Sequence, residues 1–164
     1  MKIATITFPV TATGIWLAKK KISFGKGYRN GYGGKVHPGE DIRAGAAREF
    51  NEESSAVVRA EDLELVAILD FTEGPKHLFE CHVFLTHQWV GDLKESDEME
   101  PGVLFERNNL PILEMWHGDR VWLPLVSNGE KIGAVVEYAE GMNQLASFTP
   151  VPLGEYVPLA KMIT

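Results

Sequence analysis

Three glutamates, Glu49, Glu52 and Glu53, fall within five consecutive residues, and Arg48 comes directly before them. Residues three and four positions apart share one face of a helix, so a helix here would hold the carboxylates together although like charges repel. Clustered carboxylates form sites for hard divalent cations, and Mg²⁺ usually combines a few of them with waters and phosphate oxygens. An ordinary helix could instead present the same acids to solvent, so the surrounding residues must decide between the two interpretations.

The chemistry of such a cation site would be cleavage of a diphosphate. A bound cation offsets the charge of the diphosphate and lowers the pKa of a coordinated water, and a nearby carboxylate can accept the proton of that water. We expect Glu49 and Glu53 to be the main ligands of Mg²⁺, which Mn²⁺ could replace. Glu52 is expected to be a further ligand or the proton acceptor, and Arg48 to orient the carboxylates. Glu40 would connect the preceding loop to the helix.

A glycine-rich segment comes immediately before the predicted helix. Residues 24–39 contain six glycines, which is too many for a regular element and predicts a loop whose backbone can approach a phosphate or a metal closely. Residues 41–54 then show apolar residues at helical spacing, with Asp41 as the expected cap. The loop is not a Walker A motif, because Gly33-Gly34-Lys35 is followed by Val36 and the required spacing is missing.

The remaining chain alternates between strand-like and helical segments without a regular βαβ order, which predicts a mixed α+β domain over residues 1–164. Residues 3–11 and 15–19 are expected to form a hairpin, and residues 63–72 and 78–89 an antiparallel pair. We expect further strands at 102–106 and 131–138, helices at 110–116 and 122–127, an acidic surface loop at 92–100, and an irregular tail from Pro150.

Charge and composition narrow the class of partner. The chain of 164 residues is 45% hydrophobic and carries a net charge of −7, which argues against stable binding of nucleic acid. Seven Lys and Arg residues and no acid precede Glu40, so basic groups could hold a polyphosphate while carboxylates hold its cation. A single cysteine, Cys81, and the lack of a long apolar run predict a soluble, cytoplasmic protein. The expected partner is a small-molecule nucleotide, and nothing in the sequence indicates an oligomeric state.

The segment 34–56 resembles the Nudix box at every polar position except one. The box has glycine, five residues, glutamate, seven residues, Arg-Glu, an apolar residue, any residue, Glu-Glu, any residue and glycine. The final glycine is Ser55 in this chain, which we expect to take a positive φ at a modest local cost. The matching residues are Gly34, Glu40, Arg48, Glu49, Phe50, Glu52 and Glu53.

Three further segments are similar to the 8-oxo-dGTP diphosphatase branch of the Nudix hydrolases. They are Asn30 to Val36, Glu95 to Met99, and Met115-Trp116 followed by Trp122-Leu123-Pro124. The resemblance implies an α/β/α sandwich with a mixed sheet and the box as a loop-helix-loop. It also implies hydrolysis of an oxidised purine nucleoside triphosphate to the monophosphate and diphosphate, which would cleanse the nucleotide pool.

The same resemblance implies roles for individual residues. Asn30 would hydrogen-bond the base, Trp116 would stack on it, and Lys20 would lie at the pocket edge. Asp119 could contact the purine, but Gly118 stands where the branch has another aspartate, so the preferred base stays open. The acids that would bind metal are Glu49, Glu52, Glu53 and Glu98, joined by the carbonyl of Gly34.

Other functions remain as alternatives to this interpretation. A Nudix hydrolase could act on another nucleoside diphosphate derivative, such as a nucleotide sugar or an alkylated nucleotide. A catalytically silent Nudix-fold module could bind a nucleotide without cleaving it, although such a module has no need to keep a repulsive cluster of acids. Hydrolysis of an RNA cap finds little support in the charge of −7.

Overall fold

The computed structural model describes residues 1–162. The helices are α1 (Ile42–Ser54), α2 (Asp119–Ser127) and α3 (Leu159–Met162), with 3-10 helices at Ala60–Asp62, Ile112–Glu114 and Leu153–Glu155. The strands are β1 (Ile3–Pro9), β2 (Gly14–Lys19), β3 (Arg29–Asn30), β4 (Tyr32–Lys35), β5 (Glu64–Glu73), β6 (Lys76–Thr86), β7 (Val103–Glu106), β8 (Ile132–Tyr138), β9 (Leu145–Phe148) and β10 (Val151–Pro152). No helix in the described part of the chain has the length and apolar character needed to cross a bilayer.

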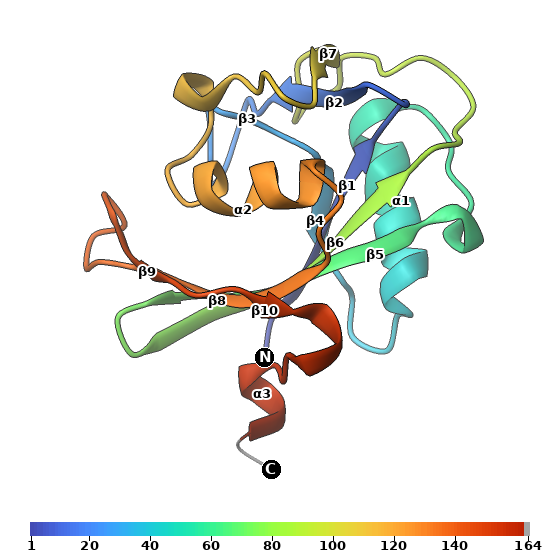
Figure 1. Cartoon of the computed structure of the whole chain (residues 1–164). Helices are drawn as coiled ribbons and strands as arrows, with labels where there is room; N and C mark the ends of the chain where they lie inside the picture. The colour runs from blue at the N-terminus through green and yellow to red at the C-terminus, as the bar shows by residue number, and fades with distance from the viewer. Residues whose placement is uncertain (163–164) are drawn as a thin grey trace.

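The main sheet mixes parallel and antiparallel pairs. Its strand order is β10-β8-β5-β6-β1-β4, with β9 paired to β8. The β5–β6 and β1–β4 pairs are antiparallel, whereas β1–β6 and β5–β8 are parallel. A smaller sheet, β3-β2-β7, lies across one end of the molecule, beyond α2 (Figure 1). The mixed sheet predicted from the sequence is therefore confirmed.

Helices cover the main sheet on both faces. Val83 and Phe84 are neighbours in β6 and point to opposite sides, as successive strand residues do. Val83 belongs to the core that contains Trp122 and Leu123 of α2, and Phe84 to the core that contains Phe50 of α1. The helices α1 and α2 consequently lie on different sides of the strands (Figure 1), which confirms the α+β class and the α/β/α sandwich.

The predicted hairpin between residues 3–11 and 15–19 is wrong. The two segments are strands, but they share a single bridge between Val10 and Ile15 and then diverge. β1 runs between β6 and β4 in the main sheet, while β2 joins the small sheet. Long-range pairing with β6 outweighs the local turn, and a local sequence pattern does not report such pairing.

The glycine-rich segment is not wholly a loop, because it contains β3 and β4. The glycines let β4 pack directly on β1: a Cβ at Gly33 would lie 1.7 Å from the carbonyl oxygen of Thr5. Glycine within a strand marks such a close backbone approach. This segment therefore brings the backbone of Gly33 close to α1, while the Tyr32 ring packs on Phe50.

The tail from residue 150 is more regular than predicted, since it forms β10, a 3-10 helix and α3. It is fastened by the buried Asp70 carboxylate, which accepts hydrogen bonds from the Tyr156 hydroxyl at 2.5 Å and the Leu159 N–H at 2.9 Å. His77 Nε2 lies 2.6 Å from the same carboxylate. The segment 110–116 is shorter than expected and forms one 3-10 turn, whereas α2 begins at Asp119, before the predicted residue 122.

The helix α1 confirms the prediction for residues 41–54. Asp41 is its N-cap and accepts a hydrogen bond from the Ala44 N–H at 3.1 Å. Ser55 is its C-cap and has a φ of 67°, the left-handed conformation expected for the final position of the box. Its N–H closes the helix on the carbonyl of Asn51. A glycine would adopt this conformation without the steric cost of a Cβ.

Replacing Ser55 with glycine should therefore stabilise the protein. We expect Ser55→Gly to raise the free energy of unfolding by about 0.5–1 kcal/mol in urea denaturation, with turnover within about twofold of the wild type. Ser55→Ala is the matched control, because it removes the hydroxyl but keeps the Cβ, and it should give no gain. A many-fold rise in turnover for Ser55→Gly would contradict a purely local role for this residue.

Candidate metal centre and base pocket

Arg48 connects the glycine-rich segment to α1. Its Nε and Nη2 donate to the two oxygens of Glu40 at 2.8 and 2.9 Å, a two-point pairing of guanidinium and carboxylate. Nη2 also donates to the carbonyl of Lys35 at 3.1 Å. The Arg48 guanidinium and the His37 N–H lower the pKa of Glu40 to about 2. Glu40 thus joins loop and helix, as expected from its position.

The same guanidinium orients two acids of α1. Arg48 Nη1 donates to Glu49 at 2.9 Å and to Glu52 at 3.2 Å. The Glu49 side chain is mostly buried, and its pKa is raised by burial although Arg48 opposes this. Glu52 is the outermost acid, with a side chain that is 54% exposed. One arginine therefore fixes the directions of both carboxylates, but only Glu49 is drawn into the protein.

Glu53 is the buried acid of the cluster and is 3% exposed. Its carboxyl accepts a hydrogen bond from the Gly33 N–H at 3.2 Å. Burial and, second, a hydrogen bond with the Glu98 carboxyl raise the pKa of Glu53 to about 8, while Gly33 and the charge of Lys20 lower it. A hydrogen bond between two carboxyls requires that one of them keep its proton. The acid from the 92–100 loop is thus brought against the acids of α1.

Gly34 completes the surroundings of these acids with its backbone. A Cβ at this position would lie 2.5 Å from the Glu49 carboxylate, so a side chain could not be accommodated without a shift. The donors gathered here are carboxylate and backbone oxygens, which are the ligands that hard divalent cations prefer. In the described part of the chain no three His, Cys, Asp or Glu side chains are already arranged as a complete metal site. Arg48 directs Glu49 and Glu52 by its hydrogen bonds, and the type and burial of the donors fit a cation.

Asn30 and Asp119, which are 89 residues apart in the chain, meet in the structure. Asn30 Nδ2 donates to one oxygen of Asp119 at 3.2 Å, and the Trp122 indole N–H donates to the other at 2.9 Å. Burial raises the pKa of Asp119 to about 7, although Trp122 and Lys20 act in the opposite direction. The charge of Lys20 lowers the pKa of both Asp119 and Glu53, so it acts on both groups of acids.

Trp116 lies among aromatic rings beside Asp119's helix. Its ring centroid is 5.3 Å from that of Phe24, 5.1 Å from that of Tyr28 and 6.5 Å from that of Tyr138. His117 packs against it at 4.5 Å. The sequence singled out Trp116 but not Phe24, Tyr28 or Tyr138. Aromatic residues within a glycine-rich segment were an available signal for the first two, whereas Tyr138 reaches the site only through the placement of β8.

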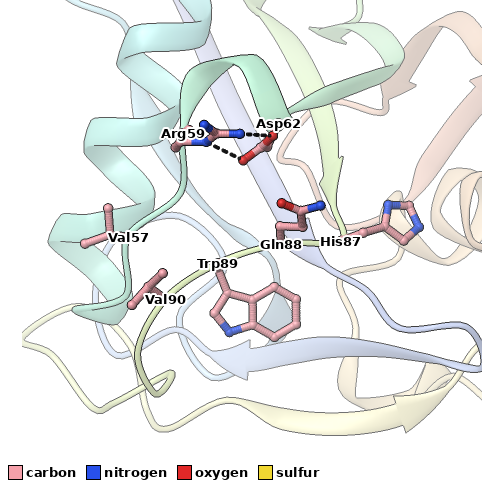
Figure 2. A pocket seen from close by; sticks show the side chains of 7 residues that line it. All are labelled: Val57, Arg59, Asp62, His87, Gln88, Trp89 and Val90. Carbon is pink, nitrogen blue, oxygen red and sulfur yellow. Dashed lines mark hydrogen bonds and ion pairs between the residues drawn. The ribbon is translucent and has the colours of Figure 1, made fainter.

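A separate surface hollow lies away from these residues (Figure 2). It is lined by seven residues of the segments that follow α1 and β6, and Arg59 pairs there with Asp62 at 2.9 Å. None of the residues expected to bind metal or substrate lines it. The lining residues are Val57, Arg59, Asp62, His87, Gln88, Trp89 and Val90.

The raised pKa of Glu53 predicts how the metal-free protein responds to pH. Between its ordinary pKa of about 4.5 and its folded value of about 8, the unfolded chain loses the Glu53 proton while the folded chain keeps it. The contribution of Glu53 to stability therefore falls as pH rises through this window. Glu53→Gln removes the charge, so in EDTA at pH 8 we expect its free energy of unfolding to exceed the wild-type value by roughly 1–3 kcal/mol, with a smaller difference at pH 5.

Glu52→Gln is the matched control, because it makes the same change on the exposed side of α1. Its stability should stay within about 0.5 kcal/mol of the wild type at both pH values. Equal responses of the two variants in thermal or urea unfolding would show that the burial of Glu53 does not raise its pKa.

Comparison with known proteins identifies the family of the chain. A model of the NUDIX domain matches residues 1–126. The oxidized purine nucleoside triphosphate hydrolase of Danio rerio is 36% identical over 126 residues, which are 76% of this chain and 79% of that protein. The protein of the same name from Mus musculus is 34% identical over 131 residues, or 79% of this chain and 82% of its own length.

Solved structures show the same fold. The MutT protein of Bacillus halodurans superimposes with a TM-score of 0.76 at 22% identity and covers 92% of this chain and 97% of its own. A MutT Nudix hydrolase of Burkholderia pseudomallei gives a TM-score of 0.65 at 24% identity, over 74% of this chain and 95% of its own. The family match, the identity to the two relatives and the shared sandwich show that this chain belongs to the Nudix family of hydrolases and is a pyrophosphohydrolase.

Proposed function

We propose that this enzyme hydrolyses purine nucleoside triphosphates, including oxidised ones such as 8-oxo-dGTP, to the monophosphate and diphosphate in a reaction that depends on Mg²⁺. The observation that carries the proposal is the pairing of Asn30 with Asp119 beside Trp116, together with a Lys20 charge that acts on both Asp119 and Glu53. One end of this site offers polar groups and an aromatic ring to a base, and the other offers carboxylates to a cation. The names of the relatives from Danio rerio and Mus musculus support the same substrate class.

The acids of α1 would hold the cation. Nudix hydrolases generally use divalent metal ions, and we assign Glu49 and Glu53 as the main ligands here. Glu52, Glu98 and the Gly34 carbonyl are assigned as supporting ligands. When bound, Mg²⁺ would offset the charge of the diphosphate and activate a water for attack on phosphorus. Metal ligands must be deprotonated, so Glu53 has to lose the proton that it keeps near neutral pH before it can bind the cation.

The other residues near the acids would orient the carboxylates, accept a proton and attract the phosphate chain. Arg48 holds the carboxylates of Glu49 and Glu52 in fixed directions before substrate arrives. Glu52 has an exposed side chain and could take the proton of the attacking water and pass it to solvent. The charge of Lys20 acts on both Glu53 and Asp119, and its ammonium would attract a phosphate chain.

The base would be held at the other end of the site. Asn30 offers a donor and an acceptor to a purine edge, and the Asp119 carboxyl, whose pKa is about 7, could accept or donate there. Trp116 would stack on the base, an interaction worth roughly 1–3 kcal/mol. Removal of oxidised nucleotides from the cellular pool would be the biological role.

A panel of nucleotides tests the activity, the cleaved linkage and the base preference together. With saturating Mg²⁺, wild-type protein should convert oxidised purine triphosphates to monophosphate and diphosphate, detected by separation of the products. Glu53→Gln should lower turnover by at least about 100-fold, since it removes a charged ligand. Preferential cleavage of nucleotide sugars, or binding without release of any product, would replace the proposal with one of its alternatives.

The stacking role of Trp116 predicts a graded response to substitution. Trp116→Leu should raise KM for purine triphosphates by about tenfold or more, because the aromatic face is lost. Trp116→Phe keeps a ring at the site and should lose much less. Steady-state kinetics with purine and pyrimidine triphosphates check this result, and equal KM values for the two variants would argue against stacking.

A further inference from the structure

Gly118 has no side chain, and the Tyr138 hydroxyl takes the space in which one would project. A Cβ at Gly118 would lie 1.9 Å from Tyr138 Oη and 2.6 Å from the ring carbon that bears it. The side chain of Tyr138, the last residue of β8, therefore reaches the N-terminus of α2 and places its oxygen beside Gly118. Glycine is required at position 118 for this contact, since no other residue leaves the volume free.

This hydroxyl is buried and lacks a hydrogen-bond partner among the described residues. The Trp116 indole N–H and His117 Nε2, which lie around it, also lack partners. Burial and the charge of Asp119 raise the pKa of Tyr138, and the nearby Trp116 N–H only partly offsets them, without a hydrogen bond of normal geometry. A buried polar group without a partner carries an energetic cost. A polar ligand that reached this place could supply such a partner.

The surrounding groups show what that ligand would be. The Tyr138 hydroxyl lies next to Trp116, which offers a ring face, and within the electrostatic reach of Asp119, which is bonded to Asn30. A flat, polar heterocycle that stacks on Trp116 would bring its edge toward these residues. We propose that the Tyr138 hydroxyl is a base-recognition group of this pocket, acting in the place where Gly118 provides no side chain. This inference rests on the proposed function, because it assumes that the pocket binds a purine.

The chemistry of a hydroxyl gives this group a particular selectivity. It can donate to a carbonyl and accept from an amino group, whereas an ionised carboxylate can only accept. A purine that carries either an oxo or an amino group on its edge would therefore find a partner. The enzyme should accept both oxidised guanine and oxidised adenine nucleotides, with similar values of kcat/KM.

Tyr138→Phe tests the role of the hydroxyl, since it removes one oxygen and leaves the ring. We expect KM for both purine triphosphates to rise by about tenfold with kcat nearly unchanged, and we expect pyrimidine triphosphates to be affected by less than about twofold. Tyr156→Phe is the matched control. It removes a hydroxyl bonded to Asp70, and Tyr156 packs over Gly133 on the other face of β8 from Tyr138, so it should leave the base preference unchanged even if stability falls.

Gly118→Ala is a second variant that perturbs the same hydroxyl, because the added Cβ must displace the Tyr138 side chain. Its KM for purines should rise as in Tyr138→Phe, because the hydroxyl is moved from its place. An unchanged purine KM in Tyr138→Phe would overturn the proposal, as would an equal loss for purines and pyrimidines. If wild-type protein cleaves no purine triphosphate, the proposed function itself fails, and that outcome is distinct from an active enzyme that tolerates Tyr138→Phe.

Discussion

The burial of the Glu53 carboxyl between α1 and β4 is the constraint on which the rest of the site depends. A strand built largely of glycine can approach the helix closely enough for the Gly33 N–H to bond this acid. The same closeness removes water from the carboxyl and raises its pKa to about 8. A cation would relieve this cost, because it favours the charged form that burial disfavours. A bound cation would therefore have to displace a proton from this buried acid near neutral pH.

The two basic residues of the site, Arg48 and Lys20, differ in which groups their charges act on. Arg48 is engaged by Glu40, Glu49 and Glu52, so its charge serves to hold the loop on the helix and to direct the acids. The charge of Lys20 lowers the pKa of Glu53 and the pKa of Asp119. If the site holds a polyphosphate, as proposed, the charge of Lys20 would attract it.

Local features of the chain were predictable from the sequence, and non-local ones were not. Asp41 as a cap and Ser55 as a left-handed C-cap follow from residues a few positions away, and the structure bears out both. The pairing of β1 with β6 joins distant segments, so the sequence pattern favoured a hairpin that does not form. Strand β4 was not predicted for another reason: glycine disfavours strands in general, and here it is needed for backbone contact with β1.

The residues of the candidate site also fall into those that local sequence could place and those that only the fold brings together. The acids of α1 could be placed from helical spacing alone, because their arrangement is set by one element. Glu98, Asn30 and Asp119 were found by resemblance, and only the fold shows that Glu98 reaches Glu53 and that Asn30 reaches Asp119. Tyr138 was missed, since its contact with Gly118 requires the end of β8 to lie beside the start of α2.

The most direct test of this account is calorimetric titration of the metal-free protein with Mg²⁺ in buffers of different ionisation enthalpy. If the buried Glu53 holds a proton that the cation must displace, binding at pH 7 should release about one proton, and the release should vanish by about pH 9.5 as the apparent affinity rises to a plateau. Glu53→Gln should show no such release. Mg²⁺ binding that is independent of pH and releases no proton would contradict the claim that the buried acid is the centre of the site.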